Sequence, residues 1–503
     1  MGICDLIMQI FCYQEIVLRV AIAYPPFESD KGVPLLTQNR QFQWFSRPTY
    51  IYPVVPAQAA TMLKRDGHEV GWLDGIAFGW SRTQFDKELI EFKPDLILLE
   101  TKTPVVAAHW SCIKELKAVM PDVMVVLVGD HVTAMPEESF KNSPVDYILT
   151  GGDYDFLLLN LLKATQSGVL DPLMLEPGIY WREGKAIKNS GKFDLKHDLN
   201  SIPWIDRELT HWKLYSEKNG NYRETPGTYI MSGRDCWHGK CTFCSWTTLY
   251  PSFRFRDPID VVDEIGDLIE KYGIREIMDD TGSLPIGNWL KTFCNEMIKR
   301  GYNKKLRFDC NMRFGHLDFE MYQLMREAGF RLVLFGVESA NQTTLDRLVK
   351  GVKVEDIVTG ARDAAKAGLD VHITMMFGYP WEGKAEIENS VALARNLLRK
   401  GYAYTLQCTM MIPYPGTPLF KDMDQNDLLL TRNWDDYDMR MQVMKCDVPE
   451  EFTKAAIRRV YKGFMHPETV IRRLLTTRDL GADLKFYWRG FHSLIGHLTD
   501  FKR

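Results

Sequence analysis

The sequence predicts an α/β fold: a doubly wound, Rossmann-like domain, then a partial barrel of six strand–helix units, then a mainly helical C-terminal region. Two observations carry this prediction. Apolar, strand-like runs alternate with amphipathic helical patterns, and the alternation occurs in two sets that do not resemble each other in residue pattern. Continuous apolar strands separated by helices are typical of parallel sheets that are covered on both faces.

The first set occupies residues 18–170. Its strand-like runs lie at 18–24, 69–74, 95–101, 123–130 and 145–152, and helical patterns lie at 57–67, 83–92 and 111–120. Right-handed crossovers then give a doubly wound sheet whose ligand binds at the carboxyl ends of the strands. Polar or glycine-rich segments follow several strands at that edge, which makes it the first candidate site.

The second set occupies residues 223–425. Its strand-like runs lie at 227–234, 275–280, 305–311, 331–339, 370–378 and 404–412, and helical patterns lie at 260–273, 288–301, 318–329 and 355–368. Six such units predict a partial or full parallel barrel with its chemistry at the C-terminal strand ends. We expect residues 1–17 to be a leader, 171–222 a linker with a hairpin at 178–187, and 426–503 a helical domain.

Composition narrows the function. The chain has 503 residues, a net charge of −4, 45% hydrophobic and 25% charged residues, which is ordinary for a globular protein and excludes a disordered or coiled-coil chain. The net charge is slightly negative, so the protein has no overall positive potential that would attract nucleic acid as a main partner. No apolar run is long enough for an integral membrane segment. The ten cysteines form no disulfide framework and the start lacks a signal peptide, so we expect a reducing, cytoplasmic location.

Three cysteines, Cys236, Cys241 and Cys244, lie together directly after the first strand of the second set, with the spacing C-x4-C-x2-C. Three thiolates on one loop bind a single inorganic centre, and thiolates favour zinc or an iron–sulfur cluster. A structural zinc site needs a fourth ligand, which His238 would supply. A [4Fe–4S] cluster on three cysteines keeps one iron open for chemistry. Three ordinary buried cysteines are the remaining interpretation.

This loop, placed after the first strand of a six-unit barrel, resembles the radical S-adenosylmethionine (SAM) superfamily. Phe243 before the last cysteine matches the superfamily pattern, whereas the stretch from Cys236 to Cys241 is one residue longer than the usual C-x3-C-x2-C. The resemblance implies that Cys236, Cys241 and Cys244 are the catalytic metal ligands of a [4Fe–4S] cluster, and that SAM binds the open iron.

The same resemblance implies SAM-binding residues at successive strand ends. Residues 279–283 stand where the family contacts the methionine amino group, for which a carboxylate is suited, although they also suit a helix N-cap. Residues 336–339 resemble the segment that binds the ribose or carboxylate of SAM. The expected SAM-binding residues are Asp279, Asp280, Thr281, Gly282, Arg313, Glu338, Ser339 and Gly378.

A doubly wound domain ahead of such a barrel resembles the cobalamin-binding domain of the family. The expected cobalamin-binding residues are Asp74, Thr101, Thr103, Gly129, His131, Gly151 and Gly152. Ile76 stands where many such domains carry the histidine that binds cobalt, so the resemblance implies a cobalt without an imidazole from this position. We expect His131 to face the corrin amides. A domain that binds another ligand, or none, is the alternative.

Together these segments resemble the cobalamin-dependent radical SAM enzymes, which include methyltransferases, the anaerobic protoporphyrin-ester cyclase and hopanoid-modifying enzymes. The resemblance implies that a 5′-deoxyadenosyl radical takes a hydrogen from an unactivated carbon and that methylcobalamin supplies a methyl group. It also implies an electron donor such as flavodoxin or ferredoxin. Three alternatives stay open: cyclisation, ring contraction or rearrangement without net methylation; a radical SAM enzyme with an empty N-terminal domain; and a zinc-stabilised, non-enzymatic binding module.

The sequence leaves the substrate open between a small molecule, a peptide and a lipid. Aromatic residues make up 12% of the chain, and those at 379–382 and 413–418 lie just past predicted barrel strands. We expect these two segments to form the floor and lid of the substrate pocket, which would suit an apolar or aromatic substrate. Packing between the domains is the plainer interpretation of such aromatic loops.

Overall fold

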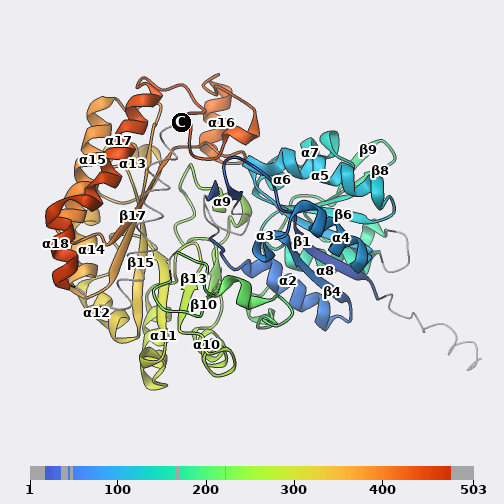
Figure 1. The fold of residues 1–503 in the computed structure, drawn as a ribbon, viewed down its shortest axis with the longest axis horizontal. Coiled ribbons are helices and arrows are strands. Elements are labelled where there is room, and N and C mark those ends of the chain that lie inside the picture. The colour runs from blue at the N-terminus through green and yellow to red at the C-terminus, as the bar shows by residue number, and fades with distance from the viewer. Residues whose placement is uncertain (1–16, 35–43, 46–48, 166–169, 221, 477–503) are drawn as a thin grey trace, which may run out of the picture.

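The computed structural model describes residues 17–34, 44–45, 49–165, 170–220 and 222–476. Almost all of the expected leader, and the tail after residue 476, therefore lie outside the described residues. The described chain forms two large sheets that lie side by side, with the short helix α9 (Trp246–Leu249) between them (Figure 1).

The first sheet confirms the predicted doubly wound fold. Its strand order is β4–β1–β5–β6–β7–β8–β9, and the first five strands are parallel. The chain starts in β1, places β4 on one side and β5 on the other, and so reverses its direction of winding between β1 and β5. The parallel strands are β1 (Arg19–Tyr24), β4 (Glu69–Asp74), β5 (Leu96–Thr101), β6 (Met124–Gly129) and β7 (Tyr147–Leu149).

Helices cover both faces of this sheet because successive side chains of a strand point to opposite faces. On β1, Val20, Ile22 and Tyr24 belong to the core beneath α2 and α8, whereas Ala21 and Ala23 belong to the core beneath α4 and α5. The helices of this domain are α2 (Val54–Arg65), α3 (Gly75–Phe78), α4 (Arg82–Phe92), α5 (Val106–Val119), α6 (Asp130–Ala134), α7 (Pro136–Asn142) and α8 (Tyr154–Ala164).

The predicted linker is in part an extension of the first sheet. Its expected hairpin forms as β8 (Ile179–Glu183) and β9 (Ala186–Asn189), and β8 pairs antiparallel with β7. A second, two-stranded ribbon joins β2 (Val33–Pro34) to β3 (Trp44–Phe45).

The second sheet has six parallel strands in sequential order. No pairing joins its first strand to its last within the described chain, so the sheet is an open, partial barrel, as predicted. Its strands are β10 (Gly227–Ile230), β13 (Glu276–Asp279), β14 (Arg307–Met312), β15 (Phe330–Glu338), β16 (Asp370–Phe377) and β17 (Thr405–Met410).

Amphipathic helices cover the outer face of the barrel sheet. In α14, Ile357, Ala361 and Ala364 recur at helical spacing and are buried, which fixes the face that packs on the sheet. The outer helices are α10 (Pro258–Tyr272), α11 (Asn288–Lys299), α12 (Phe319–Glu327), α13 (Gln342–Arg347), α14 (Val354–Lys366) and α15 (Lys384–Arg399). A short ribbon of β11 (Gly233–Arg234) and β12 (Arg254–Phe255) stands beside the barrel mouth.

The C-terminal region is helical only in part. After α16 (Pro418–Gln425), residues 426–449 form no α-helix; Trp434, Tyr437 and Met439 instead pack into the α4–α5 core of the first domain. This segment therefore connects the barrel to the first domain by packing against it. The helices α17 (Glu450–Lys462) and α18 (Pro467–Thr476) then lie along α15 at the outer edge (Figure 1).

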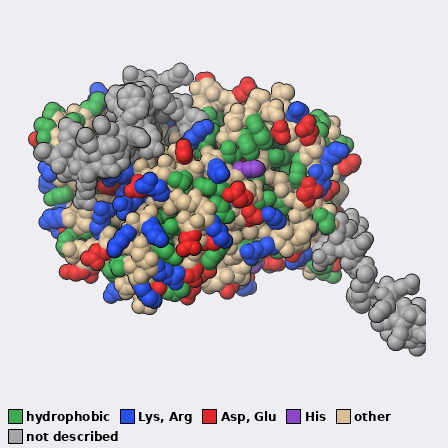
Figure 2. All heavy atoms as spheres, turned by 60° about the horizontal axis from the view of Figure 1, so that its bottom comes forward, with side chains coloured by type: hydrophobic (Ala, Val, Ile, Leu, Met, Phe, Trp, Pro, Cys, Tyr) green, Lys and Arg blue, Asp and Glu red, His purple; other side chains and the backbone are tan. Residues whose placement is uncertain are grey.

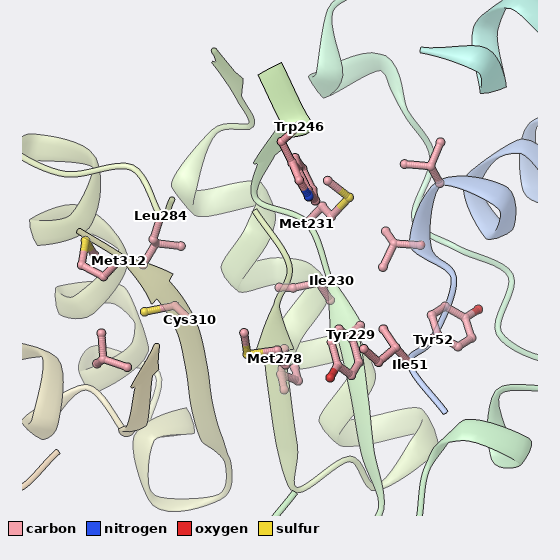
Figure 3. Packing of buried hydrophobic residues seen from close by; sticks show 14 of the residues in the cluster. Ile51, Tyr52, Tyr229, Ile230, Met231, Trp246, Met278, Leu284, Cys310 and Met312 are labelled. Carbon is pink, nitrogen blue, oxygen red and sulfur yellow. The ribbon is translucent and has the colours of Figure 1, made fainter. Parts of the chain in front are cut away.

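One apolar core runs through both domains. Ile51 and Tyr52 of the first domain lie beside Tyr229 of β10, and Met278 of β13 lies on the other side of that ring (Figure 3). All four residues are at most 6% exposed. Burying such residues at about 25 cal/mol per Å² of apolar surface favours a fixed domain arrangement.

Charged side chains of both signs are interspersed on the face of the molecule in Figure 2, in keeping with the small net charge. Within the described residues, no helix is long and apolar enough to cross a bilayer.

Gly152 tests the domain contact, because its position leaves no room for a side chain. A Cβ there would lie 1.8 Å from Cε1 of Tyr250, whose ring is fully buried. We expect Gly152→Ala to lower the free energy of unfolding by about 1–3 kcal/mol, measured by urea denaturation. Gly220→Ala is the matched control, since no atom lies within 4 Å of its Cβ; equal midpoints for the two variants would contradict the close packing.

Candidate active site

A cavity that is partly open to solvent lies at the carboxyl ends of the barrel strands. All three predicted cluster ligands line it, and so do half of the eight residues expected to bind SAM. These residues are Cys236, Cys241, Cys244, Asp280, Gly282, Arg313 and Glu338. The fold therefore brings together residues that are up to 102 positions apart in the sequence.

The cysteine loop begins at a strained residue and passes close to the next strand end. Asp235 has φ of +71°, a left-handed conformation that costs about 1 kcal/mol or more for a residue other than glycine. A Cβ on Gly282 would lie 2.6 Å from the carbonyl of Asp235. Only glycine permits this approach, so Gly282 allows the backbone before Cys236 to pass close to the strand end at the mouth of the cavity.

The additional residue of the loop is absorbed in a turn. Gly239 has φ of +58°, and Nε2 of His238 lies 2.6 Å from the carbonyl oxygen of Val349. His238 is thereby held on the outer side of the loop. Within the described residues, no group of three or more His, Cys, Asp and Glu side chains is placed to hold a single metal ion. Nε2 of His238 thus lies at the carbonyl of Val349, away from the three cysteines. A [4Fe–4S] cluster binds each cysteine to a different iron, so its thiols need not converge on one point.

Arg313 supplies a positive charge beside the thiols. Its Nη1 lies 3.7 Å from Sγ of Cys241, and its Nη2 donates a hydrogen bond to the carbonyl oxygen of Lys350. The guanidinium also stacks 5.4 Å from the ring centre of Trp237. Arg313 is 5% exposed, so its charge acts on Cys241 with little screening by water.

Glu338 ends β15 in a second strained conformation, with φ of +64°. Its Oε1 accepts a hydrogen bond of 2.6 Å from Nζ of Lys350, and both side chains are nearly buried. A Cβ on Gly336 would lie 2.2 Å from that Oε1, so Gly336 provides the space for the ion pair. Lys350 could not be predicted from the sequence, because a lysine twelve residues along the chain has no local pattern with Glu338.

Four of the expected SAM-binding residues do not line the cavity. Asp279 accepts hydrogen bonds from the backbone N–H and hydroxyl of Ser232 and from the N–H of Thr281, and burial raises the pKa of its carboxyl. The hydroxyl of Thr281 accepts a bond of 2.9 Å from the N–H of Gly233. Both residues thus hold the stem of the cysteine loop rather than facing the cavity.

Ser339 and Gly378 likewise take part in packing. The hydroxyl of Ser339 donates a 2.7 Å hydrogen bond to Glu382, and Gly378 accepts one from the thiol of Cys446 at 3.2 Å. Neither lines the cavity. The same holds for residues 379–382, the expected floor of the substrate pocket, whereas Tyr414 of the expected lid does line it.

The far wall of the cavity combines polar and flexible apolar side chains that the sequence did not mark. Thr374 and Gln407 are cross-strand neighbours on β16 and β17. His372 lies beside them, and its Nδ1 is 2.8 Å from the hydroxyl of Thr405. Methionines complete the wall at positions 278, 312, 376 and 439.

Buried hydrogen-bond donors around the cysteine loop test whether an iron–sulfur cluster fits. The indole N–H of Trp237 and the hydroxyls of Thr242 and Tyr379 are buried and have no acceptor within the described residues. Each such group costs about 1–3 kcal/mol when it stays unsatisfied. A cluster rich in sulfur acceptors would satisfy donors at this place, so the residues present fit the group.

A second cavity lies at the carboxyl ends of β1 and β5 in the first sheet. Phe27, Lys31, Arg82 and Pro104 contribute to its lining. This is the point at which the strand order reverses, and ligands of doubly wound sheets bind in the crevice there.

The glycines expected to approach cobalamin are covered by the protein itself. A Cβ on Gly151 would lie 2.6 Å from the ring of Phe193, and Gly152 lies against Tyr250 and donates a backbone hydrogen bond to Leu249 of α9. The loop after β7 is therefore part of the domain contact in this structure and lines neither cavity.

His131, expected to face cobalamin, is buried in this structure and contacts neighbouring side chains. Its Nδ1 lies 3.3 Å from the hydroxyl of Thr103, and its Nε2 lies 3.1 Å from Oε2 of Glu138. The ring also packs against Trp434 of the C-terminal segment. His131 and Thr103 therefore link the first domain to residues 426–449.

Three further predicted residues support the edge of the first sheet. The hydroxyl of Thr101 lies 3.0 Å from Nδ1 of His109, and its carbonyl oxygen lies 2.1 Å from where a Cβ of Gly129 would stand. The carboxylate of Asp74 accepts hydrogen bonds from Ala77 N and from the hydroxyl of Tyr215. Burial raises the pKa of Asp74 to about 6.

Comparisons with known proteins match the two parts of the chain separately. Residues 230–394 match the model of the radical SAM superfamily, and residues 46–156 match the B12 binding domain. An uncharacterised methyltransferase of Pyrococcus horikoshii is 27% identical over 84% of this chain and 89% of its own length. The anaerobic magnesium-protoporphyrin IX monomethyl ester cyclase of Cereibacter sphaeroides is 25% identical over 80% of this chain and 65% of its own length.

Among solved structures, the radical SAM methyltransferase TsrM from Kitasatospora setae, with cobalamin and a [4Fe-4S] cluster bound, has a TM-score of 0.64. It is 17% identical, and the match covers 82% of this chain and 75% of that chain. This likeness concerns the fold, which extends over both domains.

Glu100 lies at the carboxyl end of β5, and its burial can be tested by the pH dependence of stability. Burial raises the pKa of its carboxyl from 4.5 to about 7, although it accepts a 2.6 Å hydrogen bond from Tyr24. Between these two values the folded protein keeps a proton that the unfolded chain releases, so this group lowers stability as pH rises. The free energy of unfolding of the wild type is expected to fall between pH 5 and pH 8. In Glu100→Gln we expect this fall to be smaller by about 2–3 kcal/mol, measured by urea denaturation at each pH.

The exposed Glu91 provides the control for this measurement. Glu91→Gln is expected to retain the wild-type pH profile. An unchanged profile in Glu100→Gln would show that Glu100 is not protonated in the folded protein near neutral pH.

Proposed function

Because the chain belongs to the B12-binding radical SAM enzymes, related to magnesium-protoporphyrin ester cyclases and radical SAM methyltransferases, we propose that it methylates an unactivated carbon of its substrate. Its cofactors are those of the family: a [4Fe–4S] cluster, SAM and cobalamin. The observation that carries the proposal is the single cavity lined by Cys236, Cys241 and Cys244, which also reaches Ile51 of the first domain.

When bound, the cluster and SAM supply a carbon-centred radical and cobalamin supplies a methyl group. The residues of the chain bind and orient these groups. In this proposal Cys236, Cys241 and Cys244 hold three irons of the cluster, and Arg313 offsets the negative charge that the thiolates bring into a nearly dry site.

Two carboxylates at the cavity are proposed to bind SAM. Asp280, on the strand end after β13, is suited to the methionine ammonium group because a charge-assisted hydrogen bond forms there. Glu338 is positioned for polar groups of the same ligand and forms an ion pair with Lys350. Gly282 and Gly336 leave the space that these contacts need.

The cavity between β1 and β5 is the proposed site for part of the cobalamin. Its position at the reversal of strand order supports this assignment. Ile76 is 9% exposed and packed in the core, and both ring nitrogens of His131 lie at hydrogen-bond distance from Thr103 and Glu138. Neither position offers an imidazole to cobalt, so we propose a cobalt without an imidazole ligand from either residue.

The remaining wall of the barrel cavity is proposed to hold the substrate. Trp246, Tyr414 and Met439 exclude water from the reacting centre, which protects a radical from side reactions. Methionines adapt to ligands of varied shape. Thr374 and Gln407 offer neutral hydrogen bonds to a polar group of the substrate. An electron donor such as flavodoxin or ferredoxin is part of this proposal.

The similarity to the ester cyclase of Cereibacter sphaeroides favours one second candidate. Here the chain would use the same radical chemistry to close or rearrange a ring, with no net methylation. Both candidates share the cluster, and they differ in what becomes of the methyl group of SAM.

Cys241→Ala tests the cluster assignment. After anaerobic reconstitution with iron, sulfide and hydroxocobalamin, we expect about four irons and four sulfides per chain in the wild type. The variant is expected to lose most of this iron and to form 5′-deoxyadenosine from SAM at least about 100-fold more slowly, since the cluster loses a ligand. Cys294→Ala, at a buried cysteine on α11, is the control. Wild-type SAM cleavage by Cys241→Ala would refute the assignment.

Methyl transfer to cobalamin separates the two candidate functions without a known substrate. We expect the protein, given cob(I)alamin and SAM, to form methylcobalamin and S-adenosylhomocysteine in a ratio of one to one, followed by absorbance and mass spectrometry. A protein that binds cobalamin and cleaves SAM reductively, yet forms neither product, is a cyclase or rearrangement enzyme.

A further inference from the structure

The chain leaves α13 through a strained turn beside the cysteine loop. Val349 has φ of +51°, a left-handed conformation that glycine usually adopts at the end of a helix and that strains a β-branched residue. Its N–H donates to the carbonyl of Asp346, and the N–H of Lys350 donates to the carbonyl of Leu345. Such a conformation persists only where the surrounding contacts hold it.

The cysteine loop supplies contacts that hold this turn. The N–H of Thr242 donates a 3.0 Å hydrogen bond to the carbonyl of Leu348, and Nε2 of His238 lies 2.6 Å from the next carbonyl oxygen, that of Val349. A carbonyl oxygen only accepts, so Nε2 carries the hydrogen of this bond. A Cβ on Gly351 would lie 2.9 Å from Cε1 of His238, so the ring packs directly against the turn.

His238 belongs to the part of the loop that departs from the superfamily pattern. The stretch from Cys236 to Cys241 is one residue longer than usual, and Gly239 provides its turn with φ of +58°. The longer stretch therefore includes a side chain that contacts the turn after α13.

Lys350, which follows the strained residue, places its ammonium in the barrel cavity. The residue lines the cavity and is 7% exposed. Its Nζ lies 5.8 Å from the ring centre of Phe243, which stands between Cys241 and Cys244 in the sequence. Its backbone carbonyl accepts a hydrogen bond from Arg313. Both the backbone and the side chain of Lys350 are thus held beside the cysteine loop.

The charges of the cavity leave Lys350 as its buried cation for a ligand. Among the described residues, the Lys and Arg side chains that line the cavity are Lys240, Arg313 and Lys350. Lys240 is exposed, and the guanidinium of Arg313 contacts Cys241 and a backbone carbonyl. An ammonium has three N–H donors, and Glu338 accepts one of them at 2.6 Å. Lys350 therefore has donors for an anionic group in the cavity.

We propose that Lys350 binds the carboxylate of SAM and that His238 is a positioning residue, which holds Lys350 in place through the carbonyl of Val349. This inference rests on the proposed function only in requiring that SAM binds in the cavity of the three cysteines. Glu338 alone would repel a carboxylate, so a cation beside it is needed. With Asp280 at the ammonium group, both charged groups of the methionine part of SAM then have partners of opposite sign.

His238→Phe tests the inference by ligand affinity rather than by turnover. The reconstituted variant keeps an aromatic ring but lacks the donor, and it is expected to bind as much iron and sulfide as the wild type. Its Kd for SAM, from equilibrium dialysis, is expected to rise about fivefold. Decarboxylated SAM is expected to bind the variant and the wild type equally, because it lacks the group that Lys350 binds. Equal weakening of both ligands would replace the proposed role with a general structural one.

Two further variants serve as comparisons. His238→Gln retains a side-chain N–H donor, so its Kd for SAM is expected to stay within about twofold of the wild-type value. Lys240→Met removes the exposed cation of the same loop and is the matched control, with no change expected. A selective loss of SAM affinity in Lys240→Met but not in His238→Phe would overturn the assignment, as would equal SAM affinities for His238→Phe and the wild type.

A double-mutant cycle tests whether His238 acts through Lys350. Lys350→Met is expected to raise the Kd for SAM at least about tenfold, with a much smaller effect on decarboxylated SAM. Adding His238→Phe to Lys350→Met is expected to change the Kd less than about twofold, because coupled residues are not additive. Effects that multiply in full would contradict the positioning role, and equal loss of both ligands in Lys350→Met would contradict the carboxylate contact. A wild type that binds the cluster but not SAM would instead overturn the proposed function.

Discussion

The ion pairs of Arg234 with Asp153 and Asp155 are the contact on which both candidate sites depend. Arg234 stands two residues before Cys236, is 1% exposed, and lies 2.7 Å from Asp153 and 2.5 Å from Asp155 of the first domain. Arg234 and Arg254 hold the pKa of Asp153 well below its usual range, although burial acts in the opposite direction. Separating the domains would break these ion pairs, and removing one partner within the assembled protein would leave a buried, unpaired charge, which costs several kcal/mol. The stem of the cysteine loop is therefore fixed to the domain that matches the B12 binding family.

Neighbouring residues at the strand ends of the barrel have different roles: some support the cysteine loop and others line the cavity. Asp279 and Thr281 hold the stem of the cysteine loop, whereas Asp280 and Gly282 line the cavity. Asp235 shows why this support is needed, because its left-handed backbone persists only where surrounding contacts hold it. The residues that do not face the cavity thus keep those that do in position.

The sequence predicted the strands of both sheets well, because buried parallel strands are continuous apolar runs with few competing interpretations. It placed the cysteine loop correctly at the end of the first barrel strand. It did not distinguish Asp279 from Asp280, because the direction of a side chain after a strand is decided by partners such as Ser232, 47 residues away. The surroundings of His131 likewise include Trp434, which is distant in the sequence and which no local pattern connects with it. Residues 426–449 were expected to be helical, yet tertiary packing on the first domain determines their path.

The two cavities are joined by the same two stretches of chain. Trp44 and Asp435 line the cavity of the first sheet, whereas the barrel cavity is lined by Ile51, Ile412, Tyr414 and Met439. Arg440 donates hydrogen bonds to the carbonyls of Trp44 and Lys31, so these stretches are bound to each other. Trp434 and Tyr250 in turn cover the loops after β6 and β7. The position of the first-sheet cavity relative to the barrel cavity therefore depends on how these residues pack.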